Sequence, residues 1–213
     1  MTPVELTALA ASTSLLAGWR LYLVTLVTGL AMKFGYIALP QQLHGLDVLT
    51  NNWVLGAAAI GTLAEFFADK IAWVDSAWDA VHGFIRPLGG ALLAAAIIDS
   101  ADPTWQVVSF LLGGGAALAA HAGKAGARTL INASPEPYSN IAVSSMEDVA
   151  TGGLLALAIA NPVAAALVAA FLVFLSFSLV IKARRAIGRV MAHLSPPRER
   201  PMKDVTPPPG ASG

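Results

Sequence analysis

Residues 163–181 are the feature that most constrains the fold, because this run of 19 residues contains no charged side chain. Asn161 and Pro162, which suit the cap and the first turn of a helix, precede it, and Lys182 and Arg184 follow it. About 20 apolar residues in a helix span the hydrocarbon core of a bilayer. The segment therefore predicts a transmembrane helix whose basic end lies at the cytoplasmic headgroups.

The rest of the chain is also apolar. Hydrophobic residues make up 56% of it, charged residues 12%, and the mean hydropathy is +0.66, whereas about a quarter of a soluble domain is charged. Residues 4–31, 53–68 and 104–122 predict further spans, and the twelve-residue runs 87–98 and 149–160 predict two short Gly-Gly half-helices, each about 18 Å long. We expect an all-α, polytopic transmembrane helical bundle of about six spans, with residues 1–193 as the transmembrane domain.

The two ends of the chain indicate its orientation. Seven of the 13 Lys and Arg residues follow Ile181, which predicts a cytoplasmic C-terminus, and six crossings would make the N-terminus cytoplasmic too. Residues 194–213 are rich in Pro, Gly and charge and predict a disordered cytoplasmic tail. No basic residue precedes Arg20, so we expect the first apolar stretch to be retained in a multi-pass protein of the cell (inner) membrane.

Several function classes lack support in the sequence. The absence of cysteine excludes disulfides and thiolate chemistry. Ser144 and Ser145 have no histidine at a recognisable spacing, and residues 113–115 are glycines in an apolar helix, which does not suit a phosphate loop. We expect no enzyme activity, no cofactor and no nucleic-acid partner.

Residues 65–98 contain the strongest contrast, with seven ionisable side chains among the first 22 residues and none among the last twelve. Four of them share one helical face: Asp75, Asp79, His82 and Arg86. An apolar stripe that includes Val74 and Trp78 lies beside them, which predicts an amphipathic helix. Pro87 predicts a break directly after this helix.

Other charged residues lie inside predicted spans. Arg20 either marks a helix end or forms a buried ion pair, since an unpaired arginine in the bilayer is costly. Glu65 and Asp69 share one helical face, and His121, Lys124 and Arg128 share a face of another span. Their opposite signs predict ion pairs between helices, and solvated membrane-surface charges are the other interpretation.

Residues 53–98 and 107–160 follow a common order of span, lysine, polar segment and Gly-Gly run. Gly61 and Lys70 are nine residues apart, as are Gly115 and Lys124. This order predicts an internal repeat in parallel orientation. Repeats with interrupted helices are typical of transporters, although a duplicated bundle without transport would show the same pattern.

A family resemblance rests on AEFFADKIAWVDSAWDAVHGFIRPLGGALLAA, together with AGWRLYLVTLVTGL before it and EDVATGGLLALA after it. These segments resemble the DUF4126 family of bacterial and plant membrane proteins. The most specific part is the F-A-D-K-x-x-x-x-D-x-x-W-D-x-x-H pattern at residues 67–82, and the likeness extends to about Arg189. It implies a membrane fold but supplies no substrate and no catalytic residue.

The leading functional hypothesis is a small transporter or channel-like protein with a polar vestibule that faces the cytoplasm between the two repeats. Its site for a small solute or ion would comprise Glu65, Asp69, Lys70, Asp75, Asp79, His82, Arg86, His121, Lys124, Glu147 and Asp148. The alternative is a structural or lipid-interacting membrane protein without transport, whose amphipathic helix lies on the membrane surface. Under both hypotheses the lipid bilayer is a partner, and a second copy of the chain is a further candidate partner.

Two more specific hypotheses about the chemistry of the site have less support from the sequence. Carboxylates and an imidazole in residues 65–82 could ligate a divalent cation, but the spacing is common, and a salt bridge from Arg86 to Asp79 and His82 is favoured. We therefore expect no metal. His82 and His121 could relay protons, or each could simply be hydrogen-bonded.

Overall fold

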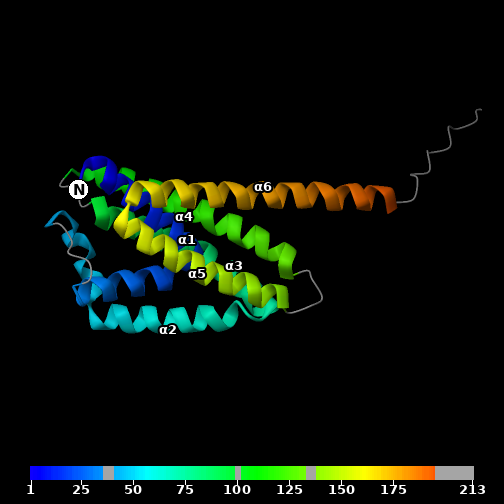
Figure 1. Ribbon diagram of the computed structural model, residues 1–213, viewed down its shortest axis with the longest axis horizontal. Coiled ribbons are helices and arrows are strands. Elements are labelled where there is room, and N and C mark those ends of the chain that lie inside the picture. Colours follow the sequence, from blue (N-terminus) through cyan, green and yellow to red (C-terminus); the bar gives the residue numbers. More distant parts are fainter. Residues whose placement is uncertain (36–40, 99–101, 133–137, 195–213) are drawn as a thin grey trace, which may run out of the picture.

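The computed structural model describes residues 1–35, 41–98, 102–132 and 138–194. They form α1 (Pro3–Lys33), the 3-10 helix η1 (Gln41–Thr50), α2 (Asn52–Ala68), α3 (Ala72–Ile98), α4 (Pro103–Asn132), α5 (Tyr138–Ala160) and α6 (Pro162–Leu194). No strand occurs within these ranges, and the helices lie together as a bundle (Figure 1). The predicted all-α fold is confirmed.

The surface of the bundle is suited to lipid. Length and composition would allow five helices to cross a membrane, namely α1, α3, α4, α5 and α6, whereas α2 is apolar but has 17 residues. Large apolar side chains point outward, as in α6, where Leu167, Phe171 and Phe174 are 61–68% exposed. Soluble domains rarely expose apolar surface this extensive to water. The chain is a multi-pass membrane protein.

α1 is interrupted in its middle. Arg20 has φ −144° and ψ 70°, which are not helical values. The first half of α1 (residues 3–19) starts near the C-terminal end of α3, because Thr7 and Ile98 line the same cavity. It then runs antiparallel to α3, and Ser14 Oγ donates a hydrogen bond to the carbonyl oxygen of Gly90 at 2.9 Å.

The second half of α1 (residues 21–33) returns along α3 in the opposite direction. Leu21 packs against Gly89, at the same level as Ser14. Further on, Gly29 lies against Leu49 of η1 and Leu55 in the first turns of α2. α1 is therefore a re-entrant helical hairpin, with Arg20 at its tip and both ends at the same end of the bundle.

This path differs from the predicted first span. The halves of α1 are about 26 and 20 Å long, and they begin and end at the same end of the bundle. Figure 1 shows the N-terminus at one end of the bundle and the last turns of α6 extending beyond the other. The two described ends of the chain lie at opposite ends of the bundle, and the predicted cytoplasmic location of both termini stays a prediction.

The predicted break after Arg86 is wrong. α3 continues through Pro87, and the Gly-Gly run that follows is its second half rather than a separate helix. The run at 149–160 is likewise part of the continuous α5. Lipid offers no hydrogen bonds to the groups that a helix end would expose, which favours continuing past the proline.

The connections between the helices are short. α4 continues to Asn132 and α5 begins at Tyr138. Residues 41–50, between α1 and α2, form η1. Residues 36–40, 99–101, 133–137 and the tail 195–213 lie outside the described residues. The internal repeat stays a prediction.

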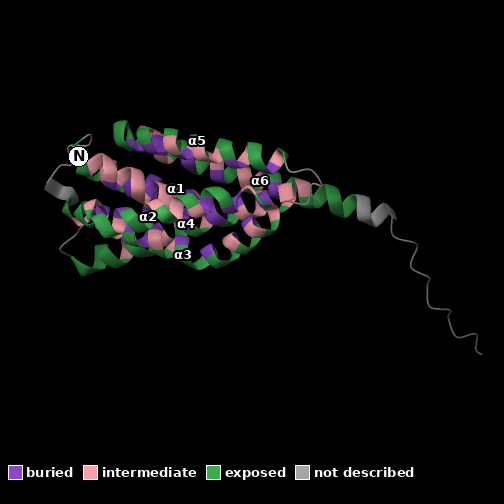
Figure 2. Cartoon of the chain, turned by 90° about the horizontal axis from the view of Figure 1, so that it is seen from below, coloured by how far each residue is buried: buried purple, intermediate pink, exposed green. Residues whose placement is uncertain are grey.

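The ionic face of α3 points into the bundle. Asp75, Asp79 and Arg86 are buried, whereas Val81 and Ile85 on the apolar face are exposed. Figure 2 shows the same pattern around the bundle, where buried residues gather on the inward sides of the helices. The polar side of α3 therefore faces the interior of the bundle, and α3 is long and apolar enough to cross a membrane.

Candidate functional site

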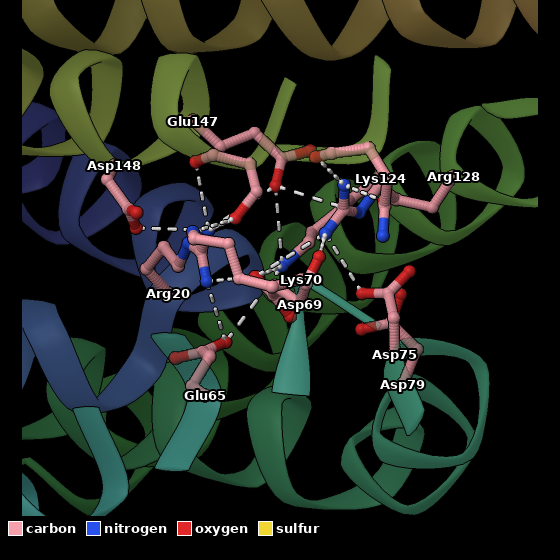
Figure 3. A network of polar contacts seen from close by, with 12 residues as sticks. Arg20, Glu65, Asp69, Lys70, Asp75, Asp79, Lys124, Arg128, Glu147 and Asp148 are labelled. Atoms are coloured by element: carbon pink, nitrogen blue, oxygen red, sulfur yellow. Dashed lines mark hydrogen bonds and ion pairs between the residues drawn. The ribbon is translucent and has the colours of Figure 1, made fainter. Parts of the chain in front are cut away.

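Charged side chains from five helices and the α2–α3 connection meet in the interior. Eight of them are at most 6% exposed: Arg20, Glu65, Asp69, Asp75, Asp79, Arg86, Lys124 and Arg128. Two carboxylates of α5 lie at their edge, Glu147 at 20% and Asp148 at 27% side-chain exposure. We call these ten residues the ionic centre (Figure 3).

Asp69, directly after the last residue of α2, is one hub of the ionic centre. Its Oδ2 pairs with Arg20, and it lies 3.5 Å from Lys124 Nζ and 3.7 Å from Arg128 Nη2. Three cations surround this buried carboxylate and offset the cost of burying its charge. Asp69 is thus an ionised anchor for α1 and α4.

Arg86 is the second hub. Its guanidinium donates to Glu65 Oε1 at 2.5 Å, to Asp79 Oδ1 at 2.8 Å and to His121 Nδ1 at 2.7 Å. Glu65 Oε1 also lies 3.9 Å from Lys124 Nζ and so connects the two hubs. The predicted ion pairs between helices are present and buried, and the surface-charge interpretation is wrong.

Arg128 connects the ionic centre to the N-terminal ends of α3 and α5. It donates to Asp75 Oδ1 at 3.1 Å and to Asn140 Oδ1 at 2.7 Å. Asn132, one turn further along α4, donates to Asp75 Oδ2 at 2.7 Å. Sequence reasoning missed both asparagines, although the four-residue spacing of Arg128 and Asn132 was a usable signal.

The interruption of α1 is stabilised by cations of this centre. Lys124 Nζ donates to the carbonyl oxygen of Trp19 at 3.2 Å, the last residue of the first half of α1. Arg20 donates to the carbonyl oxygen of Ser144 in α5 at 3.2 Å. Backbone groups freed at membrane depth need such partners, and a cation suits the negative end of a helix. Arg20 therefore combines both of its predicted roles, helix end and buried ion pair.

The two histidines are hydrogen-bonded as neutral rings. Because Arg86 can only donate, His121 Nδ1 accepts, and its Nε2 donates to the carbonyl oxygen of Asp79 at 3.1 Å. His82 Nδ1 donates to the Trp78 carbonyl at 2.8 Å, so in its neutral form this ring has the opposite tautomer and its Nε2 accepts from the Tyr22 hydroxyl, 2.9 Å away. The predicted contact between His82 and Arg86 is not among these bonds. This arrangement favours the hydrogen-bonded interpretation over a proton relay.

The edge of the ionic centre is less tightly held. Glu147 Oε2 lies 3.6 Å from Arg20, 3.7 Å from Lys124 and 4.0 Å from Arg128. Asp148 Oδ1 lies 3.0 Å from Arg20. Lys70 donates to Ser144 Oγ at 2.9 Å and lies beside the centre rather than within its ion pairs.

A polar cavity of about 340 Å³ adjoins the centre between α3 and α4. Its lining residues are Ser76, Asp79, Ala80, Gly83, His121, Ala125, Arg128, Thr129 and Asn132. Small residues of both helices leave this space open, and three buried polar side chains of the site reach it. Within the described ranges, no three His, Asp or Glu side chains are arranged to hold a metal ion.

The family described as "Domain of unknown function (DUF4126)" matches residues 7–182. The chain belongs to the DUF4126 family. No curated protein and no solved structure matches it. The matched part of this DUF4126 chain contains every residue of the ionic centre and all of the re-entrant hairpin except its first few residues.

Proposed function

We propose that this DUF4126 protein is a small transporter or channel-like protein of the cell (inner) membrane, with a polar vestibule open to the cytoplasm between the predicted repeats. The observation that carries the proposal is the interruption of α1 at Arg20, inside a buried cluster of charges. Broken helices at membrane depth are tolerated where they line a polar site, and they typically form the sites of transporters. Ionisable side chains at such depth mark ion or solute pathways.

The cavity between α3 and α4 is a suitable vestibule. It joins Asp79 and His121 of the buried site to polar residues of the outer turns, such as Ser76 and Asn132. These two residues lie near the start of α3 and at the end of α4. Figure 1 shows α6 extending beyond this end of the bundle, and the C-terminal part of α6 contains Lys182 and Arg184. Basic residues accumulate on the cytoplasmic side, so the vestibule would open inward.

The re-entrant hairpin leads to a topology prediction. Five crossings by α2 to α6 would place the N-terminus outside and the C-terminus in the cytoplasm. Reporter fusions after Met1 and after residue 194 should therefore give opposite locations, with the C-terminal fusion cytoplasmic. Two cytoplasmic locations would contradict the hairpin and restore a six-span arrangement.

Single cysteines test whether the cavity is wet, and the chain has no cysteine of its own to remove. Gly83→Cys should react with a membrane-impermeant thiol reagent added to inside-out vesicles. A side chain fits at this position, since its Cβ would lie 3.6 Å from the nearest atom, His121 Nε2. We expect Ala125→Cys, across the cavity, to react as well.

Phe84→Cys is the matched control, because Phe84 neighbours Gly83 on α3 but is 84% exposed on the bundle's outer, lipid-facing surface. It should stay unmodified until the membrane is dissolved. Equal protection of Gly83→Cys and Phe84→Cys would contradict a water-filled vestibule. A flux screen of ions and small solutes with the reconstituted protein, repeated with Asp79→Asn, would then identify the substrate.

A structural or lipid-interacting role is the second candidate. Each of the eight buried charges has an opposite charge within 4.0 Å, as in a network that holds helices together. A buried pair is costly to break even where it has no role in transport. Reactive cysteines in the cavity together with substrate flux would exclude this candidate.

A further inference from the structure

The ionic centre contains more negative than positive charge. Its six carboxylates are Glu65, Asp69, Asp75, Asp79, Glu147 and Asp148, and its four cations are Arg20, Arg86, Lys124 and Arg128. His82 and His121 are neutral in their hydrogen bonds. Even if Lys70 at the edge is included, one negative charge has no counterpart. An uncompensated charge below the headgroups costs several kcal/mol or is neutralised by something bound.

Two buried carboxylate oxygens of the ionic centre accept no hydrogen bond from the protein. Glu65 and Asp69 are 1% and 0% exposed, yet Glu65 Oε2 and Asp69 Oδ1 accept no hydrogen bond. On the guanidinium side, Arg20 Nε and Arg128 Nε have no acceptor. Water could satisfy both kinds of group, because it donates and accepts. Water alone, however, would leave the surplus negative charge in place.

Arg20 has more carboxylate neighbours than the other cations of the ionic centre. Four carboxylates lie within 4.0 Å of its guanidinium: Glu65, Asp69, Glu147 and Asp148. Glu147 Oε2 makes no hydrogen bond, and its three neighbouring cations are all at least 3.6 Å away. Asp148 Oδ2 also has no hydrogen-bond partner. Glu147 and Asp148 are also the two members of the centre that solvent reaches most.

We propose that the Glu147–Asp148 edge of the ionic centre binds one monovalent cation, either a proton or a hydrated alkali-metal ion. The charge of the ligand balances the surplus carboxylate, and its water or hydroxyl group satisfies the oxygens that lack donors. A hydrated ion or a proton suits the site, because no three ligands in the described residues converge as a bare metal ion requires. Binding of the cation does not depend on the proposed function. Only its role does, because in a transporter the bound cation would be coupled to transport.

The cation would also connect α5 to the re-entrant hairpin. Arg20, at the tip of α1, contacts Asp148 at 3.0 Å and the carbonyl oxygen of Ser144 at 3.2 Å, both in α5. A positive ligand beside Asp148 weakens the attraction between this carboxylate and Arg20. Binding would therefore loosen the contact between α5 and the hairpin, and release would tighten it.

Two measurements on the purified protein in detergent distinguish a bound proton from a bound alkali-metal ion. At constant pH and ionic strength, an alkali-metal site predicts a Tm about 3–5 °C higher in Na⁺ or K⁺ at about ten times Kd than in N-methylglucamine. A proton site predicts no such difference. It predicts instead that, on acidification of the unbuffered protein from about pH 8 to about pH 6, where an ordinary carboxylate stays ionised, the wild type takes up about one more proton than the Asp148→Asn variant, as measured with a pH indicator.

Asp148→Asn and Glu147→Gln should each abolish the response. Both remove a surplus negative charge at the half-buried edge, so we expect them to fold, and a variant that does not fold leaves the wild-type measurements decisive. Asp47→Asn is the matched control, since Asp47 is an exposed carboxylate of η1. It should behave as the wild type in both measurements.

A wild-type protein that responds neither to alkali-metal ions nor by extra proton uptake would overturn the proposal. So would a response that persists unchanged in both Asp148→Asn and Glu147→Gln. Both measurements use equilibrium binding and need no transport. A negative result here would not contradict the proposed vestibule. Likewise, a dry cavity in the cysteine test would not contradict the proposed cation site.

Discussion

Replacing Arg86 with methionine is expected to lower the free energy of unfolding by about 3–5 kcal/mol, because it leaves buried carboxylates without their counter-charge. Arg86 is 0% exposed and donates to Glu65 at 2.5 Å and Asp79 at 2.8 Å. Its loss leaves Asp79 without a cation within 4.0 Å, while Glu65 keeps the more distant Arg20 and Lys124. Methionine fills similar volume, so the loss would report charge rather than packing. Reversible unfolding in mixed micelles, followed by circular dichroism, would measure it.

Arg184→Met provides the control, since Arg184 is an exposed arginine beyond the apolar part of α6. Its effect should stay below about 1 kcal/mol. Adding Glu65→Gln and Asp79→Asn to Arg86→Met should recover part of the loss, because the unpaired charges are then removed. An Arg86→Met protein as stable as Arg184→Met would show that water, rather than the guanidinium, balances Glu65 and Asp79.

The second large effect concerns the close approach of α3 and α4. A Cβ at Gly113 would lie 2.3 Å from Ala94 Cβ and 2.7 Å from the carbonyl oxygen of Gly90. Gly113→Ala should therefore force the helices apart and destabilise the protein by about 1–3 kcal/mol. The same unfolding assay measures it.

Gly115→Ala is a control on the same helix, because nothing lies within 4 Å of a Cβ there. It should be neutral or stabilise the protein by up to about 1 kcal/mol through helix propensity. If the two alanines had equal effects, the α3–α4 interface would be looser than the structure shows. The cation site would be unaffected by either outcome.

Much of the fold could be predicted from residue patterns. The uncharged run at 163–181 predicts a span because no other environment accepts so many apolar residues in one helix. The helical spacing of Asp75, Asp79 and Arg86 places them on one face, and the structure buries that face. The opposite charges of Asp69 and Lys124 predict a pair, which lies at 3.5 Å.

The errors came from local rules that tertiary structure overrides. Pro87 is a strong helix breaker in water, yet α3 passes through it, because in lipid an interrupted helix loses hydrogen bonds that nothing replaces. Arg20 shows the converse. Its neighbours are apolar and helix-compatible, but the helix breaks there because Lys124 supplies a partner for the freed carbonyl of Trp19, while the Arg20 side chain bonds the Ser144 carbonyl of α5.

The sequence by itself determined the solvent of this protein, its helical class and which side chains carry charge inside the membrane, since these follow from hydropathy and period along one segment. Only the tertiary structure decided that α1 turns back at Arg20 and that six carboxylates share four cations. Both depend on distances between segments up to about 130 residues apart, such as Arg20 and Asp148 at 3.0 Å. Periodicity within a helix fixes which face is polar, but it does not fix which polar faces meet.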